Sequence, residues 1–590
     1  MNLKKTLLLL VLLAAIVAFF ALDLGRFLSL EQLKQSQASL ADQVAQHPLQ
    51  VAGVYFAVYV AATALSLPGA TIITLAGGAL FGLWWGTLIV SFASSIGATL
   101  AFLVSRYLLR GGIEARFGQR LAEINKGIEK DGAFYLFTLR LIPVVPFFVI
   151  NLVMGLTTMK ARTFYAVSQL GMLAGTLVYV NAGTQLAQID SLRGILSPGL
   201  IGSFVLLGVF PLIARRIVDA VRRRQVYARW AGVRPRSFDR NLIVIGAGAG
   251  GLVSAYIAAA VKAKVTLVEA HKMGGDCLNY GCVPSKALIK SAKLAHQMRH
   301  GARYGLGNTE PAFSFKAVMQ RVQDVIRAIE PHDSVERYTG LGVEVLQGYA
   351  KLVNPWTVQI ALNDGTQQTL TARSIVIAAG ARPFVPPLPG LDEVGFVTSD
   401  TLWETFGQLD ELPRRLVVLG GGPIGCELAQ AFARLGAQVT QVEMAPRILL
   451  REDEDVSDAA RQALQADGVT VLTGHKAVRV EKHPEPTEPS TGSGRTGGVL
   501  VVEHAGTEHR IAFDQLICAV GRSARLTGYG LEELGIPVNR TIDTNEYLQT
   551  LYPNIYAAGD VAGPYQLTHV AAHQAWYAAV NALFGEWKLF

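Results

Sequence analysis

Two cysteines, Cys277 and Cys282, lie five residues apart in a glycine-rich segment and are the residues best placed to do chemistry. The segment follows a predicted strand that ends at Glu269, and it opens a predicted helix. A helix N-terminus lowers the pKa of a thiol and favours the reactive thiolate. A structural pair or half of a metal site is the alternative, but no Cys or His cluster is in reach to complete a zinc site. The pattern predicts a redox-active pair and no metal.

A dinucleotide-binding unit is predicted directly before this pair. Gly246, Gly248 and Gly251 form a G-x-G-x-x-G pattern that follows an apolar strand and opens a helix. The first glycine makes the tight turn, the second lets a pyrophosphate approach the backbone, and the third lets helix and strand pack closely. Glu269, at the end of the next strand, is placed to accept hydrogen bonds from a ribose.

The same unit occurs a second time. Gly420, Gly422 and Gly425 follow another strand, and Glu443 ends the strand after that. Two such units predict two dinucleotides, one bound tightly and one exchanging. Glu443 favours the 2′-hydroxyl of NADH and repels the phosphate of NADPH, although Arg447 lies nearby.

The segment at residues 274–286, G-G-x-C-x4-C-x2-P-S-K, resembles the active site of the pyridine nucleotide–disulphide oxidoreductases, such as dihydrolipoamide dehydrogenase and mercuric reductase. The resemblance implies that Cys282 is the thiolate against the flavin and that Cys277 is the interchange thiol that attacks the acceptor. It also implies that Lys286 lies near flavin N5 and pairs with Glu427 beside the nicotinamide. Surface solvation is the alternative for these last two residues.

The same resemblance assigns further cofactor contacts. Asp560 would bind the ribityl hydroxyls of FAD, and the helix that begins near Thr568 would point its positive end at the flavin pyrimidine ring. The remaining positions expected at the cofactors are Gly275, Asp276, Ala379, Gly380, Gly521 and Gly559. The expected cofactors are FAD and a nicotinamide dinucleotide, with NADH favoured over NADPH.

One departure from the family concerns the C-terminus. In family members, the chain continues for about a hundred residues past the motif that corresponds to Gly559-Asp560, and these residues form an interface domain. That domain makes the dimer and supplies a His–Glu acid–base pair to the partner. Here Phe590 lies only 30 residues beyond Asp560, and His569 and His573 belong to the flavin-side helix. The dimerisation domain is therefore expected to be absent from this chain, which leaves the reductive half complete and the acceptor half incomplete. Either the sequence is a truncated form of a longer chain, or the substrate arrives from elsewhere.

The first part of the chain has the composition of a membrane protein. Hydrophobic residues make up 51% of the chain and charged residues 17%, and the apolarity is concentrated before residue 215. The run at 6–22 is expected to be an uncleaved anchor, with a signal peptide as the alternative. Further apolar runs cover residues 49–67, 71–104, 133–155, 164–186 and 195–213. The run at 71–104 is too long for one helix of about 20 residues.

The run at 133–155 is predicted to enter the membrane and return. It carries Arg140, Pro143 and Pro146, and proline breaks a helix. Its flanking loops are basic, which places both on the cytoplasmic side. Broken backbone at membrane depth is tolerated only where protein or a water-filled cavity satisfies it. Arg140 is therefore either a functional residue in a polar pathway or a structural one that snorkels or pairs with carbonyls.

Residues 51–216 resemble the DedA-type, SNARE-associated (VTT) membrane family. The likeness rests on Leu67-Pro68-Gly69, on the glycine-rich segment 76–82, and on Arg140-Leu-Ile-Pro143-Val-Val-Pro146 with Asn151 and Gly155. That family is implicated in moving lipids or lipid-linked carriers and uses two re-entrant helices. Proton-coupled members carry acidic residues near the first of these, but residues 49–105 contain no Asp or Glu. Lipid scrambling without proton coupling is therefore expected.

A basic segment joins the two halves. Residues 215–240 hold nine arginines and two aspartates, which is most of the net charge of +8. The positive-inside rule places this segment on the cytoplasmic face, where it can touch anionic lipid. Nucleic-acid binding is not expected, because no base-stacking pattern or recognition motif accompanies the charge.

The predicted fold is multi-domain: an α-helical membrane domain with re-entrant hairpins, followed by an α/β flavoprotein with two Rossmann-like dinucleotide-binding domains. The domains expected are 1–48 (anchor and amphipathic segment), 49–216 (VTT-like), 217–240 (linker), 241–400 (FAD), 401–521 (NAD(P)) and 522–590 (return to the FAD domain). We expect a multi-pass inner-membrane protein with a cytoplasmic oxidoreductase half, whose partners are membrane lipid and a small-molecule acceptor. A lipid translocator with a fused redox partner and a redox sensor that gates the membrane half are the alternatives.

Overall fold

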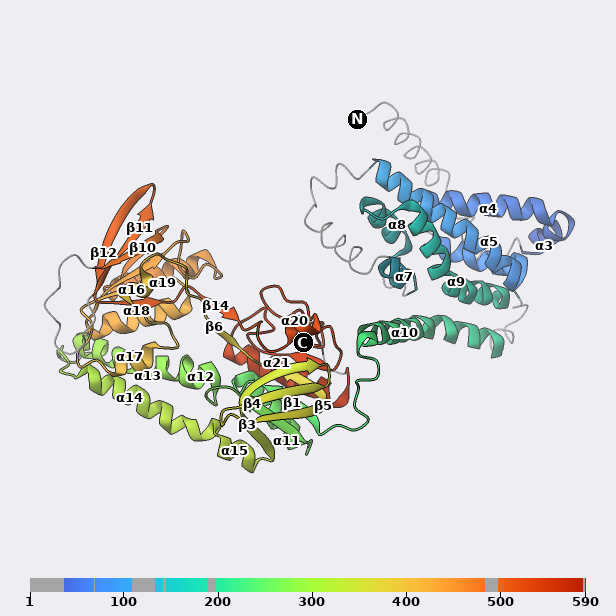
Figure 1. The fold of residues 1–590 in the computed structure, drawn as a ribbon. Coiled ribbons are helices and arrows are strands. Elements are labelled where there is room, and N and C mark those ends of the chain that lie inside the picture. Colours follow the sequence, from blue (N-terminus) through green and yellow to red (C-terminus); the bar gives the residue numbers. More distant parts are fainter. Residues whose placement is uncertain are drawn as a thin grey trace. The chain divides into compact units, whose positions relative to one another are not determined.

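The computed structural model describes residues 37–67, 69–108, 133–141, 145–187, 198–482, 497–586 and 589–590. The chain divides into two compact units, residues 1–225 and residues 226–590 (Figure 1). The predicted anchor at 6–22, Pro143 and most of the Pro/Gly/Ser-rich segment that separates β10 from β11 lie outside the described residues.

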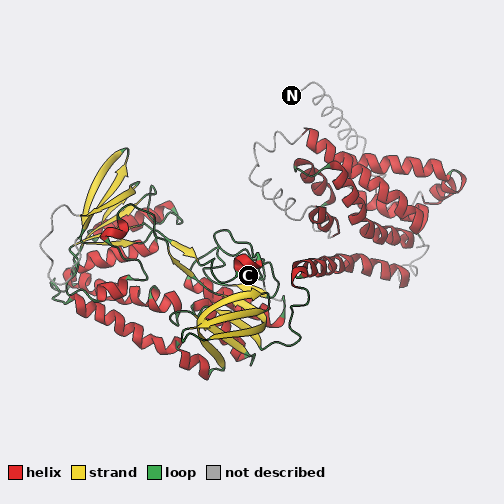
Figure 2. Ribbon diagram, in the orientation of Figure 1, coloured by secondary structure: helices red, strands yellow, loops and turns green. Residues whose placement is uncertain are grey.

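The described part of the first unit is helical (Figure 2). Its helices are α3 (Gln37–Gln46), α4 (Pro48–Ala64), α5 (Ala70–Leu108), α7 (Ala133–Leu141), α8 (Phe147–Leu156), α9 (Ala161–Leu186) and α10 (Pro198–Val226). Of these, α5 and α9 are long and apolar enough to cross a membrane. They coincide with two of the long apolar runs of the sequence.

Helix α5 is interrupted at Gly82, whose φ of 72° and ψ of −175° are not helical. Only glycine adopts such a backbone without a steric cost from Cβ, which explains why the long run at 71–104 breaks at this point. Glycines also let α5 and α9 approach closely. A Cβ on Gly78 would lie 2.1 Å from the carbonyl oxygen of Val180, and one on Gly183 would lie 2.1 Å from that of Leu75. Small residues at such crossings are typical of helices packed in membranes.

The proline-containing run at 133–155 holds two short helices, of which α7 ends at Leu141 and α8 begins at Phe147. Pro146 is the residue that precedes α8, a position where its missing N–H is not needed by the helix. The backbone at Pro146 is not helical, so the run is interrupted at this proline as predicted.

The second unit begins with a parallel sheet whose strand order is β3-β2-β1-β5-β15, with β4 pairing antiparallel to β3 and β5. Its elements are β1 (Arg240–Ile245), α11 (Ala249–Ala260), β2 (Val265–Glu269), α12 (Gly275–Asn279), α13 (Cys282–Arg299), α14 (Phe315–Ile329), α15 (Val335–Gly340), β3 (Val343–Asn354), β4 (Thr357–Leu362), β5 (Gln367–Ile377), β15 (Ile555–Ala557) and α21 (Thr568–Phe584). Helices α11 and α21 pack together beside this sheet.

A second parallel sheet, of order β13-β7-β8-β9, is accompanied by the antiparallel strands β10-β11-β12. Its elements are β7 (Arg415–Leu419), α18 (Pro423–Leu435), β8 (Gln438–Glu443), α19 (Glu454–Ala466), β9 (Thr470–Thr473), β10 (Lys476–Lys482), β11 (Gly498–His504), β12 (Thr507–Phe513) and β13 (Gln515–Cys518). The connecting elements are β6 (Ala381–Pro383), α16 (Leu391–Val394), α17 (Leu402–Gly407), β14 (Arg522–Ala524) and α20 (Leu531–Leu534). The two predicted Rossmann-like folds are both present.

The redox segment, residues 274–286, carries the two cysteines and connects the two sheets. Helices α13 and α14 share a hydrophobic core with α17, α18 and β7, so the helix that begins at Cys282 packs against the second dinucleotide fold. The two connections between the folds also pair with each other, because β6 and β14 form an antiparallel ribbon. Movement of the second fold would therefore act directly on the redox segment.

The predicted linker at 217–240 is helical as far as Val226 and then packs on the second unit. Tyr227 stacks on Trp356 with ring centroids 5.0 Å apart, and its hydroxyl donates to Asn554 at 2.6 Å. Trp230 donates from its indole N–H to the Tyr552 hydroxyl at 2.8 Å. These aromatic contacts fix the end of the basic segment to residues that follow β3 and precede β15.

Candidate active site

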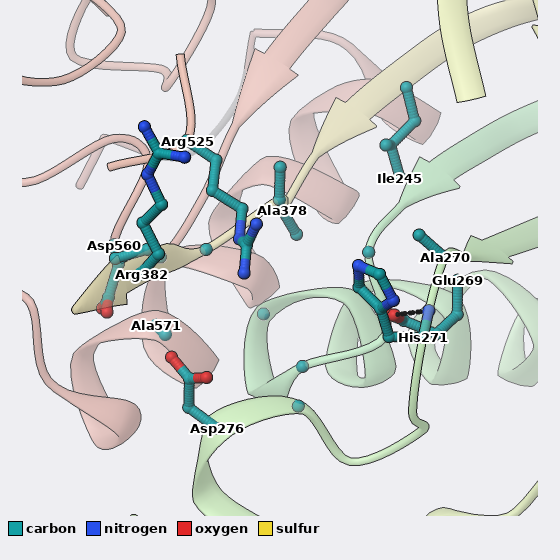
Figure 3. Close-up of a pocket in the computed structure, with 18 of the residues that line it drawn as sticks. Ile245, Glu269, Ala270, His271, Asp276, Ala378, Arg382, Arg525, Asp560 and Ala571 are labelled. Atoms are coloured by element: carbon teal, nitrogen blue, oxygen red, sulfur yellow. Dashed lines mark hydrogen bonds between the residues drawn. The ribbon is translucent and has the colours of Figure 1, made fainter. Parts of the chain in front are cut away.

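A cavity of about 590 Å³ opens at the carboxyl ends of β1 and β2. This edge of a parallel sheet is where doubly wound folds bind their ligands. Predicted site residues that line the cavity are Gly246, Gly248, Glu269, Gly275, Asp276, Cys277, Ala379, Gly380, Gly559 and Asp560. Figure 3 shows Glu269 and His271 at one end, Asp276 and Asp560 toward the other, and Arg525 reaching between them.

The glycines of the first loop are required by close backbone contacts. A Cβ on Gly251 would lie 1.7 Å from the Gly246 carbonyl oxygen, and one on Gly275 would lie 2.5 Å from the Cα of Gly248. The carboxylate of Glu269 accepts hydrogen bonds from the backbone N–H groups of Ala247 at 2.6 Å and His271 at 2.8 Å. The loop and the acidic residue are thus held together beside the cavity.

The donors and acceptors around the cavity fit FAD. Carboxylates suit its ribose and ribityl hydroxyls, and Arg382 and Arg525 offer positive charge to a pyrophosphate beside the glycine loop. Burial raises the pKa of Asp560. Burial also raises the pKa of Asp276 to about 6, against the opposing effect of Arg522. Acidic side chains held out of water in this way are suited to hydrogen-bonding a polar ligand.

The two cysteines lie at the start of α12 and α13 as free thiols. A hydrogen bond from Cys277 lowers the pKa of Cys282 to about 5, with further contributions from Thr568 and Lys286. The same bond, together with burial, raises the pKa of Cys277 strongly. The Thr568 hydroxyl lies 3.5 Å from the sulfur of Cys282, at the first residue of α21. Cys282 is therefore the thiol that ionises first.

Lys286 and Glu427 form an ion pair between α13 and α18. The Nζ of Lys286 lies 2.8 Å and 2.6 Å from the two carboxylate oxygens of Glu427. Both side chains are substantially exposed, at 59% and 41%. The structure brings together the two residues that the sequence analysis pairs. Lys286 lies one turn along the helix that begins at Cys282.

Two contacts that the sequence analysis misses hold the segment that carries the cysteines. Nη2 of Arg522, at the start of β14, donates to Asp276 at 2.5 Å, and Nη1 lies 3.4 Å from Asp400. The indole N–H of Trp403, in α17, donates to the backbone carbonyl of Tyr280 at 2.8 Å. The arginine does follow directly after the predicted Gly521, but no sequence signal marks Trp403.

In the second fold, Glu443 repeats the geometry of Glu269. Its carboxylate accepts from the backbone N–H groups of Gly421 at 2.6 Å and Ala445 at 2.7 Å. A Cβ on Gly425 would lie 2.2 Å from the carbonyl oxygen of Gly420, whereas Gly422 has no atom within 4 Å of a Cβ. The guanidinium of Arg447 donates to the backbone carbonyls of Glu452 and Leu450.

The membrane-half candidates lie in the first unit. Arg140 is in the last turn of α7 and is buried, and Pro146 precedes α8. Pro143 lies outside the described residues. Cavity-lining residues that the sequence analysis misses are His271, Lys272, Tyr349, Arg382 and Arg525. They come from loops and sheet edges with no motif, so only the fold brings them to the cavity.

Comparison with known proteins agrees with this geometry. A model of the family described as pyridine nucleotide-disulphide oxidoreductase matches residues 240–575, and a VTT domain model matches residues 67–185. The chain belongs to the pyridine nucleotide–disulphide oxidoreductase family and carries a VTT domain before it. Both family resemblances found in the sequence are confirmed. Members of this oxidoreductase family use FAD and NAD(P)H.

Individual relatives resemble the second unit. A mercuric reductase of Bacillus cereus is 34% identical over 59% of this chain and 52% of its own length. A dihydrolipoyl dehydrogenase of Thermus scotoductus is 34% identical over 58% of this chain and 70% of its own length. The solved structure of a Cu(II) complex of a mutant of RclA, an HOCl-induced flavoprotein disulfide reductase from Escherichia coli, matches with a TM-score of 0.50. It is 28% identical and covers 59% of this chain and 72% of its own. The chain thus spans about half the length of the mercuric reductase.

Proposed function

We propose that residues 226–590 form an FAD-dependent NAD(P)H oxidoreductase in which the Cys277–Cys282 pair reduces a disulfide, a metal ion or a similar small-molecule acceptor. The observation that carries this proposal is the asymmetry of the two thiols. Cys282 has a pKa of about 5 and Cys277 a strongly raised one, and their hydrogen bond is the main cause of both shifts. Such a difference suits a pair in which one sulfur stays as a thiolate and the other carries the exchangeable proton.

FAD, when bound in the cavity, would accept a hydride from NAD(P)H and pass two electrons to the disulfide. The chain's own residues prepare this transfer. Thr568 and the positive end of α21 lie beside Cys282 and favour its thiolate. Cys277, which lines the cavity, would then act as the interchange thiol that attacks the acceptor. Lys286 and Glu427 would orient the nicotinamide ring of the second dinucleotide. Their ion pair joins α13, which begins at Cys282, to α18, which follows the second glycine loop.

NADH is the proposed reductant rather than NADPH. Glu443 presents a carboxylate where the ribose of the second dinucleotide would lie, and a carboxylate repels a 2′-phosphate. Arg447 is already engaged by two backbone carbonyls. It is therefore poorly placed to neutralise such a phosphate.

The redox proposal is tested with the purified full chain. Adding NADH under anaerobic conditions should bleach the flavin and raise the number of reactive thiols by two per chain. A Cys282→Ser protein should still lose its flavin colour with NADH but gain no thiols. Flavin that stays oxidised in the presence of NADH would overturn the proposal. A tenfold or larger preference for NADPH would overturn the choice of NADH alone.

The second candidate function belongs to the membrane half: passage of a lipid or lipid-linked carrier, with the flavoprotein as redox partner or sensor. It is favoured by the buried polar side chains where α5 faces α9. The hydroxyls of Thr87 and Ser95 and the amide oxygen of Gln169 are buried without a hydrogen-bond partner in the described part of the chain. We propose that α7–α8 and the first part of α5, as far as Gly82, are re-entrant hairpins around this polar route. We also propose a multi-pass protein whose basic segment and oxidoreductase half face the cytoplasm.

Scrambling of fluorescent lipid in vesicles that contain the full chain tests this second function. Collapse of the fluorescence of both leaflets on adding an impermeant quencher supports it, and quenching of the outer leaflet alone contradicts it. Repeating the assay with and without NADH separates a redox-gated pathway from an independent one.

A further inference from the structure

Gln441 is a polar side chain in the core of the second dinucleotide fold. It lies on β8, two residues before Glu443, and it is completely buried. Its Nε2 donates to the backbone carbonyl of Gly420 at 3.0 Å. Its Oε1 is buried and has no hydrogen-bond partner among the residues that the structure describes. Because a buried acceptor without a donor costs free energy, packing alone does not explain a glutamine here, and its role must lie at the bonded nitrogen.

The peptide unit between Gly420 and Gly421 is held at both ends by side chains of β8. Gln441 donates to the carbonyl oxygen of this peptide at 3.0 Å. Glu443 accepts from its N–H at 2.6 Å. Residues two apart on a strand point to the same face of the sheet, so both side chains reach the glycine loop from one side. The two bonds together fix the orientation of this peptide.

The first dinucleotide fold has only one of these two bonds. Its loop is built alike, because in both folds the N–H of the first glycine donates at 2.8 Å to the strand residue that precedes the glutamate. By this equivalence Leu267 of β2 takes the place of Gln441, and it is also completely buried. Leucine has no donor, so of the two positions only Glu269 bonds to the first loop, at the N–H of Ala247. The architecture therefore accepts an apolar residue where the second fold has a glutamine.

A thiol adds a further polar contact at the second loop. Sγ of Cys426 lies 3.5 Å from Nε2 of Gln441, and the thiol donates to the carbonyl of Gly421 at 3.5 Å. Burial raises the pKa of Cys426, so at neutral pH the thiol keeps its proton for this bond. The equivalent residue of the first fold is Leu252, the first after its third glycine. An apolar pair thus supports one loop and a polar pair the other.

We propose that Gln441 is a positioning residue for the second dinucleotide, because it holds the Gly420–Gly421 peptide in the orientation that a pyrophosphate needs. This inference rests on the proposed function, in which the second loop binds NAD(P)H and releases its product in every turnover. A tightly bound FAD can itself hold the first loop, whereas a loop that binds its ligand anew must keep its shape between turnovers. Holding such a loop in its binding conformation raises affinity, since less conformational entropy is lost on binding.

Calorimetric titration of NAD⁺ into the full chain, purified with FAD, tests this role. NAD⁺ does not reduce the flavin, so the measurement is independent of the thiols. In Gln441→Leu the dissociation constant of NAD⁺ should rise about tenfold, and that of ADP-ribose should rise equally because both ligands contain the pyrophosphate. Unchanged NAD⁺ affinity overturns the inference and leaves the proposed function intact. A loss for NAD⁺ alone places the effect at the nicotinamide and also overturns the inference. If the wild type binds neither ligand, the proposed function fails together with it.

Stability and kinetics separate positioning from a packing role. Gln441→Leu removes one unpaired acceptor, the glutamine Oε1, and leaves another, the Gly420 carbonyl, so the midpoint of urea unfolding should stay or rise. At saturating NADH the flavin should be reduced at the wild-type rate, with the half-saturating NADH concentration raised about tenfold. A lower urea midpoint with loss of FAD would show a packing role and overturn the proposal. Gln441→Met keeps the length of glutamine and should behave as Gln441→Leu does, and wild-type affinity in Gln441→Met would assign the effect to side-chain shape and likewise overturn it.

Gln515→Leu is the matched control. Gln515 is a buried glutamine of the same sheet, and it begins β13 opposite Leu416, at the start of β7. The glycine loop follows the other end of β7. The same chemical change at this position should therefore leave the affinities for NAD⁺ and ADP-ribose unchanged. An equal loss of affinity here would show a general effect of removing a buried glutamine from the sheet and would overturn the assignment to Gln441.

Discussion

Nη2 of Arg522 lies 2.5 Å from Oδ2 of Asp276, the residue that immediately precedes Cys277. Arg522 begins β14, one of the two strands that connect the dinucleotide folds. The same guanidinium also contacts Ser399 and Asp400, on the segment that follows the first connection. One arginine therefore joins both connections to the redox segment.

Replacing this arginine tests whether the contact positions the thiols. In Arg522→Gln the partly buried carboxylate of Asp276 loses its cation. We expect the free energy of unfolding to fall by about 1–3 kcal/mol, the pKa of Asp276 to rise further, and disulfide reduction by NADH to slow. Urea unfolding and rapid-mixing absorbance measure these effects. Arg479→Gln, which breaks the pairs with Glu481 and Glu508 far from the cysteines in the sequence, is the control and should not slow disulfide reduction.

The indole hydrogen bond of Trp403 is a second, independent support of the same loop. Trp403→Phe keeps most of the buried ring but removes the bond to the carbonyl of Tyr280. We expect a loss of about 1 kcal/mol in stability and faster alkylation of Cys277 by iodoacetamide, because the loop between the cysteines is less restrained. If the alkylation rate is the same in both proteins, the loop is held by other contacts.

The ionisation of Cys282 predicts a pH dependence for the reduced enzyme. Its pKa is lowered to about 5 by the hydrogen bond from Cys277, so it is a thiolate at pH 7 and becomes a neutral thiol as the pH falls through about 5. The long-wavelength absorbance of a thiolate against oxidised flavin should therefore be present at neutral pH and disappear below about pH 5. In Cys277→Ser the donor is altered and the midpoint should shift, whereas Cys282→Ser should show no such absorbance at any pH. A midpoint near the ordinary thiol value would contradict the assignment.

The pairing of Lys286 with Glu427 should matter for rate and little for stability. The pair is exposed, and exposed ion pairs contribute about 0–1 kcal/mol. We expect Glu427→Gln to leave urea unfolding nearly unchanged and to slow flavin reduction by NADH about tenfold, which corresponds to about 1.4 kcal/mol in the barrier. The exposed pair between Lys316 and Asp410 offers the control, since Asp410→Asn should affect neither measurement. A normal rate in Glu427→Gln would place the pair outside the reaction.

Much of this site follows from the sequence because local patterns specify local geometry. The glycine loops, the cysteine spacing and the acidic strand ends all act within about thirty residues, and the structure places them as expected. The pair formed by Lys286 and Glu427 is also predicted, but through family resemblance rather than spacing. Arg522 and Trp403 could not be predicted, because their contacts span 246 and 123 residues of sequence. Such contacts depend on how the segments that connect the two dinucleotide folds pack against the redox segment. The spacing of residues in the sequence does not predict this packing.

The two glycine loops offer a final comparison. In Gly251→Ala and Gly425→Ala the new methyl group would collide with a backbone carbonyl, at 1.7 Å and 2.2 Å. Since backbone cannot give way as a side chain can, helix and strand must separate. We expect Gly251→Ala to lose FAD and stability together, and Gly425→Ala to keep FAD but lose NADH binding. Gly422→Ala meets no atom within 4 Å, so it should unfold like the wild type and yet bind NADH more weakly, because the second glycine faces the pyrophosphate. Urea unfolding, flavin content and NADH titration distinguish the three variants, and unchanged NADH affinity in Gly422→Ala would show that the dinucleotide does not approach this loop.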